Sequence, residues 1–330
     1  MESILPVVFV FIMGLALLLY VVLDGYDLGI GLLLPLAEDA EKDIMIASIG
    51  PFWDANETWI VLGIGVLLIA FPVAHGVILT SLYLPVTIML MGLILRGVAF
   101  DFRVKAGLEK KAMWNRLFFL GSLIASSAQG WMLGYYITGL QDNMISYLFS
   151  GLIACTLPAL YLMLGSAWLL IKTESTLFDK AAVWGYYAFW PMVIGLGLIS
   201  IATPIVSDVI AARWFVLPNL IGLLPIPAVS LITLVIIYQL LRNAKDFIRS
   251  YPWTVFACLV LICLLAATGL AYSIFPDIII GRMTIWEAAS ATKSLSFVLV
   301  GVVITMPVIL IYNVFVYRIF RGKATDLSYE

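Results

Sequence analysis

Apolar runs long enough to cross a bilayer recur along the whole sequence. About 20 residues of helix span the ~30 Å hydrocarbon core. The chain is 63% hydrophobic and 12% charged, whereas soluble domains are about 45–50% apolar and about 25% charged. The sequence therefore predicts an all-α polytopic membrane protein, one transmembrane domain with nine helices at roughly 5–34, 55–74, 77–98, 115–139, 147–171, 182–203, 214–241, 253–275 and 294–318.

Positive charge is unequal on the two sides of this predicted arrangement. Of the 18 Lys and Arg residues, only Arg213, Arg282 and Lys293 fall on the side of the N-terminus. Cytoplasmic loops carry the excess of Lys and Arg. We therefore expect an outside N-terminus and a cytoplasmic C-terminus, with the other fifteen basic residues in 35–54, 96–116, 172–181, 242–252 and the C-terminal segment.

Two acids interrupt the first apolar run. Asp24 and Asp27 lie in DGYDLGIG and share one helix face, since residues three apart are neighbours. Each ionised Asp near mid-helix costs roughly 2.5–3.5 kcal/mol to insert. These acids must therefore face protein, water or a positive partner, or be protonated. The glycines beside them allow another helix to approach closely.

The second run repeats the pattern near its start. Asp54 and Glu57 lie in GPFWDANETW, Arg96 follows near the end of the third run, and Asp101 comes five residues later. Arg96 is the nearest candidate counter-charge. We expect a polar cluster facing the cytoplasm and formed by Asp24, Asp27, Asp54, Glu57, Arg96 and Asp101. Such acids default to function in membranes, so a proton relay is one interpretation, and structural ion pairing is the other.

Histidine is scarce among the residues available for cofactor chemistry. The single histidine, His75, falls in the short break FPVAHG at 71–76, which we interpret as an exposed turn. Haem iron is held by His, Met, Cys or Tyr. A single histidine makes this chain a poor haem carrier, although its 12 Met residues leave other ligands open; we expect no haem and no metal in it. In the longest outer loop, Thr284 and Glu287 of TIWEAAS have capping-box spacing, which indicates either a short helix or a plain surface loop.

Several motifs together resemble one known family. DGYDLGIGLLLP, SIGPFWDANETWIVLG, LYLPVTIMLMGLILRGVAFDFR, TIWEAAS and VYRIFRGK follow one another over almost the whole chain. They resemble subunit 2 of the bacterial cytochrome bd-type quinol oxidases, and the ETW ending is similar to the cyanide-insensitive branch. The resemblance implies two four-helix bundles plus one additional helix.

The same resemblance implies partners and roles. Subunit 1 would carry the b-type and d-type haems, and this subunit would carry none and not be catalytic alone. The complex would oxidise ubiquinol or menaquinol and reduce oxygen to water with cytoplasmic protons. The resemblance assigns Asp54 to a proton path and places Asp24, Asp27 and Arg96 near such paths, whereas the position of Glu57 is variable.

The resemblance also allows for a small accessory single-helix subunit and a quinone bound to this chain. We expect contacts with membrane lipids in the bacterial inner membrane and none with nucleic acid. Two other functions use the same acids. A secondary transporter would carry H⁺ or Na⁺ with them, although no internal repeat of the kind typical of transporters is visible. A purely structural anchor would use them to hold a catalytic partner.

Overall fold

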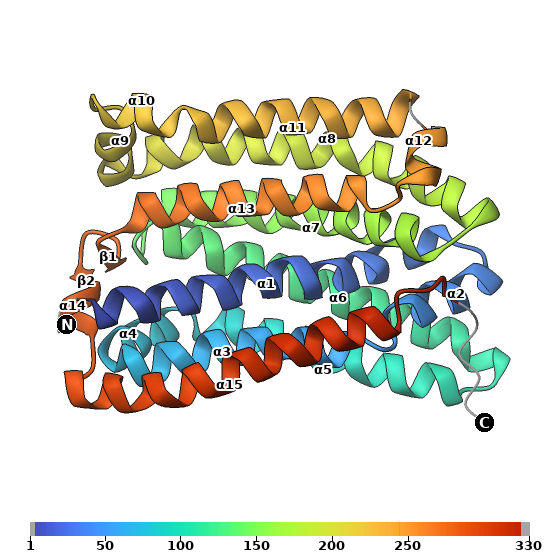
Figure 1. Ribbon diagram of the computed structural model, residues 1–330, viewed down its shortest axis with the longest axis horizontal. Coiled ribbons are helices and arrows are strands. Elements are labelled where there is room, and N and C mark those ends of the chain that lie inside the picture. Colours follow the sequence, from blue (N-terminus) through green and yellow to red (C-terminus); the bar gives the residue numbers. More distant parts are fainter. Residues whose placement is uncertain (1–3, 244, 325–330) are drawn as a thin grey trace.

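Long helices run side by side along the long axis of the molecule, with short elements and loops at its two ends (Figure 1). The computed structural model describes residues 4–243 and 245–324. Within these residues, nine helices are long and apolar enough to cross a membrane. The prediction of an all-α membrane protein with nine spans is confirmed.

The spanning helices are α1 (Leu5–Leu33), α3 (Trp53–Ala70), α5 (Tyr83–Lys105), α6 (Leu108–Ile137), α7 (Met144–Lys172), α8 (Ser175–Val206), α11 (Pro225–Asn243), α13 (Thr254–Ile274) and α15 (Thr292–Ile319). The shorter elements are η1 (Leu34–Leu36), α2 (Asp39–Ile49), α4 (Pro72–Ser81), α9 (Asp208–Trp214), α10 (Asn219–Leu223), α12 (Lys245–Ser250), β1 (Asp277–Ile279), β2 (Met283–Thr284) and α14 (Ile285–Ala288). The two strands pair antiparallel.

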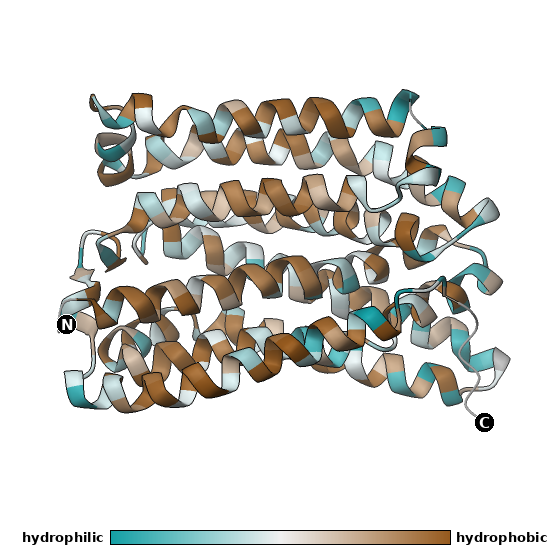
Figure 2. Cartoon of the chain, in the orientation of Figure 1, coloured by the Kyte–Doolittle hydropathy of each residue, from teal (hydrophilic) through white to brown (hydrophobic). Residues whose placement is uncertain are grey.

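Hydropathy follows this arrangement. The middle of each long helix is apolar, and hydrophilic residues gather toward the ends, above all around α2 and α12 (Figure 2). We call this the basic end, since the connections rich in Lys and Arg lie there. The N-terminus, α4, α14 and the two strands lie at the opposite end (Figure 1).

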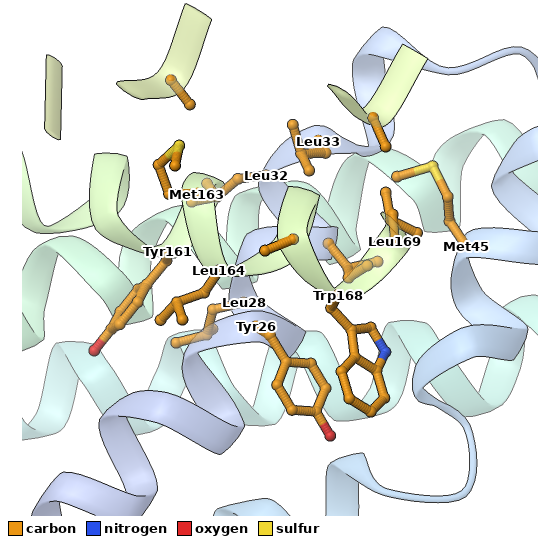
Figure 3. Packing of buried hydrophobic residues seen from close by; sticks show 14 of the residues in the cluster. Tyr26, Leu28, Leu32, Leu33, Met45, Tyr161, Met163, Leu164, Trp168 and Leu169 are labelled. Carbon is orange, nitrogen blue, oxygen red and sulfur yellow. The ribbon is translucent and has the colours of Figure 1, made fainter. Parts of the chain in front are cut away.

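Helix α1 lies at the centre of the bundle and approaches α7 very closely. A Cβ atom added at Gly29 would lie 1.8 Å from the carbonyl oxygen of Tyr161, and one added at Gly165 would lie 2.5 Å from the carbonyl carbon of Gly29. Only glycine permits such backbone contact. Further along the same interface, Tyr26 stacks on Trp168 with ring centroids 4.1 Å apart (Figure 3).

The break between the second and third spans differs from the prediction. The chain forms α4 there, beginning at Pro72, so the half-buried His75 lies in a helix and not in a turn. Proline favours the first position of a helix, where its missing N–H has no partner to lose. Helix α3 consequently ends at Ala70 and α5 begins at Tyr83.

Other span ends also differ from the predicted ones. Helices α6 and α8 begin at Leu108 and Ser175, before the predicted starts at 115 and 182. A helix that leaves the membrane keeps its backbone hydrogen bonds, whereas hydropathy marks only the part in hydrocarbon. The region predicted as one span over 214–241 forms α10 and then α11, which starts at Pro225.

The short helix predicted in TIWEAAS is present as α14. The Glu287 carboxylate accepts from the Thr284 backbone N–H at 2.7 Å, and the Glu287 N–H donates to the Thr284 hydroxyl at 3.3 Å. This is the reciprocal capping box that the spacing indicated. It confirms the helix over the plain loop.

Candidate functional site

Arg96 is the centre of a buried charged cluster formed by three helices. Its Nη1 lies 2.7 Å from Asp24 Oδ1 on α1, and its Nη2 pairs with Glu57 on α3. The Arg96 and Asp24 side chains are 1% and 0% exposed, and that of Glu57 is 26% exposed. A buried charge is tolerated only when it is paired, so Arg96 compensates both acids.

Asp24 keeps unused hydrogen-bonding capacity. Among the described residues, neither of its carboxylate oxygens has a hydrogen-bond partner, so the contact with Arg96 is an ion pair without hydrogen-bond alignment. Tyr20, one turn earlier on α1, lies within electrostatic reach of the Asp24 carboxylate. The Oδ2 of Asp24 is therefore available to accept a proton, and the ion pair with Arg96 opposes that step.

Asp27, also buried, is held by an amide instead of a cation. The Asn56 side-chain nitrogen donates to Asp27 Oδ2 and to the Tyr26 hydroxyl, at 2.8 Å in each case. The second oxygen of Asp27 is without a hydrogen-bond partner in the described part of the chain. The Tyr317 hydroxyl donates to Asn56 Oδ1 at 3.1 Å and lies 2.6 Å from the Tyr26 hydroxyl.

A second set of polar side chains extends from Tyr20 into the bundle. The Gln129 amide nitrogen donates to the Tyr20 hydroxyl, and the Tyr161 hydroxyl donates to Gln129 Oε1, both at 2.6 Å. All three side chains are buried. They link α1, α6 and α7 by hydrogen bonds beside Asp24.

The structure brings four of the six predicted site residues together: Asp24, Asp27, Glu57 and Arg96. Asp54 and Asp101 are exposed, and within residues 4–243 and 245–324 neither forms an ion pair or a side-chain hydrogen bond. Asp54 lies one turn before Glu57 on α3 and acts on it electrostatically, so it marks the exposed edge of the cluster. The structure does not bring Asp101 to Arg96, because five residues turn a helix by about 140° relative to the Arg96 face; a part for Asp101 in a proton path stays a prediction.

Sequence reasoning missed six polar side chains of the site: Tyr20, Tyr26, Asn56, Gln129, Tyr161 and Tyr317. Asn56 could have been predicted as a site residue, since an amide inside an apolar helix generally forms a hydrogen bond with another helix. The tyrosines could not have been predicted, because a sequence does not distinguish a tyrosine in a buried hydrogen-bonded site from one at the membrane interface or in packing. Their pairing depends on the rotation of each helix about its axis.

A separate ion-paired cluster lies closer to the basic end. Arg103 on α5 lies 2.7 Å from Asp43 on α2, and its Nε donates to Asn115 on α6 at 2.5 Å. Lys111 also pairs with Asp43, at 3.2 Å. These contacts join α2 to the helices that carry the buried site. In the described ranges, no group of three or more His, Cys, Asp or Glu residues is arranged to hold a metal ion.

The fold and site define a class: a polytopic membrane protein with carboxylates buried among its first three spanning helices. The family model for cytochrome bd terminal oxidase subunit II matches residues 5–320. The chain belongs to this family, and it is therefore a subunit of a membrane-bound oxidoreductase. This assignment replaces the transporter interpretation.

Curated relatives and a solved structure agree with the family. The chain is 25% identical to cytochrome bd-I ubiquinol oxidase subunit 2 of Escherichia coli K12, over 97% of this chain and 95% of that protein. It is 26% identical to cytochrome bd ubiquinol oxidase subunit 2 of Bacillus subtilis 168, over 92% of both. The fold is similar to a chain of the bd oxidase from Geobacillus thermodenitrificans, with a TM-score of 0.73, 16% identity and coverage of 97% of this chain and 99% of that one.

Proposed function

We propose that this chain supports a haem-bearing subunit 1 and supplies the carboxylates of a proton-uptake path. The complex would oxidise quinol and reduce oxygen to water. Reduction of one oxygen molecule to two waters uses four electrons and four protons, so an enzyme buried in a membrane needs a route for protons. The observation that carries the proposal is the pair of buried acids, Asp24 and Asp27: both oxygens of Asp24 and Oδ1 of Asp27 lack hydrogen-bond partners within the described residues.

The path would open at the basic end of the molecule. Asp54 is exposed, Glu57 is partly exposed, and Asp24 is fully buried, so the acids lead from the surface inward. The excess of Lys and Arg at this end favours a cytoplasmic location for it and an outside N-terminus. Asp101 lies outside the proposed path.

Each residue has a distinct part in this mechanism. Asp24 and Asp27 take up and release protons. Arg96 stays charged and compensates the negative charge that a deprotonated acid leaves in an apolar surrounding. Glu57 connects Arg96 to the exposed Asp54, and Asn56 orients the carboxylate of Asp27.

The other cofactors and partners follow from the family. The haems would reside in subunit 1, where they would carry electrons to oxygen. In support, this chain has one histidine as a possible haem ligand, His75, and it lies in α4, at the end of the molecule opposite the basic end (Figure 1). The names of the relatives from E. coli and B. subtilis support quinol as the electron donor. We assign no residue of this chain to a quinone or an accessory subunit.

The two ion pairs of Arg96, with Asp24 and with Glu57, also fix α1, α3 and α5 against one another, which is the role that a structural anchor requires. Acid-to-amide changes separate the two functions, because an amide keeps the shape of the side chain and does not take part in proton transfer. The variants are Asp24→Asn and Asp27→Asn, with Asp101→Asn as the matched control outside the cluster.

The measurement is oxygen consumption by the purified complex, normalised to its haem content. We expect the turnover rate to fall about tenfold or more in each buried-acid variant. A positioned proton-transfer group contributes at least about 10²-fold to the rate, and the acid that remains in each variant should preserve part of that contribution. Asp101→Asn should retain the parent rate. Unchanged turnover in both buried-acid variants of an intact complex would reject the proton path and leave the structural role.

A further inference from the structure

We propose that Tyr317 is a positioning residue of this site. We propose further that a set of contacts between the end of α7 and the C-terminal segment, which we call the clasp, holds Tyr317 in place; the clasp consists of Lys172, Thr173, Phe320, Gly322, Lys323 and Ala324. Tyr317 lies on α15, the last spanning helix, yet its hydroxyl reaches the amide that holds Asp27. The inference rests on the proposed proton path and extends it to the C-terminal end of the described chain.

Three side chains form a closed ring of hydrogen bonds beside Asp27. The Tyr317 hydroxyl donates to Asn56 Oδ1, so the Tyr26 hydroxyl donates to the Tyr317 oxygen, 2.6 Å away. The Asn56 nitrogen donates to the Tyr26 hydroxyl and to Asp27. Each group in the ring donates to the next and accepts from the one before it.

This ring contributes to the orientation of the Asn56 amide, in which the nitrogen faces Asp27. Two orientations of an amide have nearly the same shape and differ only in the exchange of donor and acceptor. A hydroxyl that donates to the oxygen holds the nitrogen toward the carboxylate. The Leu23 carbonyl oxygen, 3.3 Å from the Asn56 nitrogen, favours the same orientation. Without the Tyr317 hydroxyl, the Asn56 oxygen loses its donor, and the amide is held less firmly with its nitrogen toward Asp27.

The position of Tyr317 is set by a clasp at the end of α7. The Lys172 ammonium donates to the carbonyl oxygens of Phe320 and Gly322, the latter at 3.2 Å. In return, the backbone N–H of Ala324 donates to the carbonyl oxygen of Lys172 at 2.8 Å. The side chain of Lys323 donates to the carbonyl oxygen of Thr173 at 3.0 Å.

The clasp and the ring share an aromatic cluster. The Lys172 ammonium lies 5.0 Å from the centroid of Phe52 and 5.3 Å from that of Trp168. Phe52 stacks on Tyr317 with centroids 4.6 Å apart, and Trp168 stacks on Tyr26 at 4.1 Å. The charge of Lys172 thus holds the two rings against which both tyrosines of the hydrogen-bonded ring pack.

Helix α15 packs against the bundle mainly through partly buried side chains, so the clasp adds a polar attachment at its end. Of its residues, only Leu295 and Asn313 are buried. Lys172 is 3% exposed and forms no ion pair among the described residues, so its interactions are those with the backbone carbonyls and the rings. A buried cation with this set of partners is placed to hold the C-terminal segment.

The first test is Tyr317→Phe, which keeps the stacked ring and removes only the hydroxyl. We expect a kcat for oxygen consumption about fivefold lower, with KM for quinol unchanged, as for the loss of about one hydrogen bond. The solvent isotope effect on kcat should rise, and the infrared carboxyl band that disappears in Asp27→Asn should shift. The matched control is Tyr147→Phe, which removes a hydroxyl that donates to Asp142 at the opposite end.

The second test changes the clasp. Lys172→Met should reproduce the kinetic and infrared effects of Tyr317→Phe, and Lys172→Arg, which retains charge and donors, should restore most of the rate. The two changes combined should lower kcat no further than Tyr317→Phe alone, because both act through the same hydroxyl. Proteolysis after residue 318 should become faster in Lys172→Met.

The outcomes separate this inference from the proposed function. If Asp27→Asn lowers turnover while Tyr317→Phe leaves both kcat and the carboxyl band as in the parent, the inference is wrong and the proton path stands. If Asp27→Asn leaves turnover unchanged, the part of Asp27 in the proton path is wrong, and the infrared band alone decides whether Tyr317 positions the site.

Discussion

Arg96 and Asp24 form an ion pair of 2.7 Å with both side chains almost completely buried. A guanidinium or a carboxylate alone would be very costly in such a place, and each is tolerated because the other is present. Arg96 also pairs with Glu57. The three residues therefore differ in their number of ionic partners: among the described residues, Arg96 has two, and Asp24 and Glu57 have one each.

The difference in the number of ionic partners predicts the order of stability of single variants. Arg96→Gln should lower the free energy of unfolding by about 3–5 kcal/mol, because it leaves two acids without a counter-charge. Asp24→Asn should cost less, since Arg96 keeps its contact with Glu57. The midpoint of thermal unfolding of the purified complex is the measurement.

The double variant, with both Arg96→Gln and Asp24→Asn, is the control for this comparison. It should be more stable than Arg96→Gln alone, because it leaves one uncompensated acid fewer. A double variant less stable than either single variant would contradict the view that the pair is coupled.

The sequence predicted the charged part of the site and not its hydrogen-bonded surroundings. Asp24, Asp27 and Arg96 were recognisable because charges are rare in apolar runs, and the three-residue spacing of the acids showed that they share a helix face. Tyr26 and Tyr317 are 291 positions apart, and nothing in either residue type indicates the other. Such pairing depends on helix rotation and packing, which hydropathy does not encode.

Errors in the predicted fold have equally local causes. Nearness in sequence to Arg96 suggests that Asp101 belongs to the cluster, although the helix turns it to another face. His75 was placed in a turn because the apolar pattern cannot distinguish a break in a span from the short helix α4. The nine spans themselves were predictable, because backbone polar groups in hydrocarbon must be satisfied within helices.

The contact between α1 and α7 predicts a strong effect of one added methyl group. Gly29→Ala would place a Cβ atom 1.8 Å from the backbone oxygen of Tyr161, so the two helices must separate. We expect the thermal midpoint and the recovery of the complex with haem to fall clearly. Gly14→Ala, on the same helix with no atom within 4 Å of the added Cβ, should behave like the parent. Equal stability of the two variants would show that the close approach has no energetic role.

The capping box of α14 predicts a local pH dependence. The Thr284 backbone N–H, followed by the Thr284 hydroxyl, lowers the pKa of Glu287 below its ordinary value of 4.5. A carboxyl with a lowered folded-state pKa adds stability above its unfolded pKa and loses it as the pH falls through the folded value. Hydrogen exchange in the segment 283–289 should therefore show protection that is lost below about pH 4.5.

Glu287→Gln is the control for that measurement. A glutamine has no charge to lose, so the variant should show weaker protection at neutral pH and no additional loss in acid beyond the intrinsic change of exchange rate. A parent protein whose protection relative to this variant stays constant between about pH 7 and pH 3 would contradict the role of the Glu287 charge.

The buried hydrogen bonds of Gln129 predict that a double variant is more stable than one of its single variants. Gln129→Leu removes the partner of both Tyr161 and Tyr20, and a buried polar group left without a partner costs about 1–3 kcal/mol. In the double variant Gln129→Leu/Tyr161→Phe, one of the two hydroxyls that lose this partner, that of Tyr161, is absent, so part of the lost stability should return. Thermal unfolding of the complex compares the parent with Gln129→Leu, Tyr161→Phe and the double variant. Losses that simply add would show that the two side chains do not form a hydrogen bond that contributes to stability, since coupled neighbours deviate from additivity.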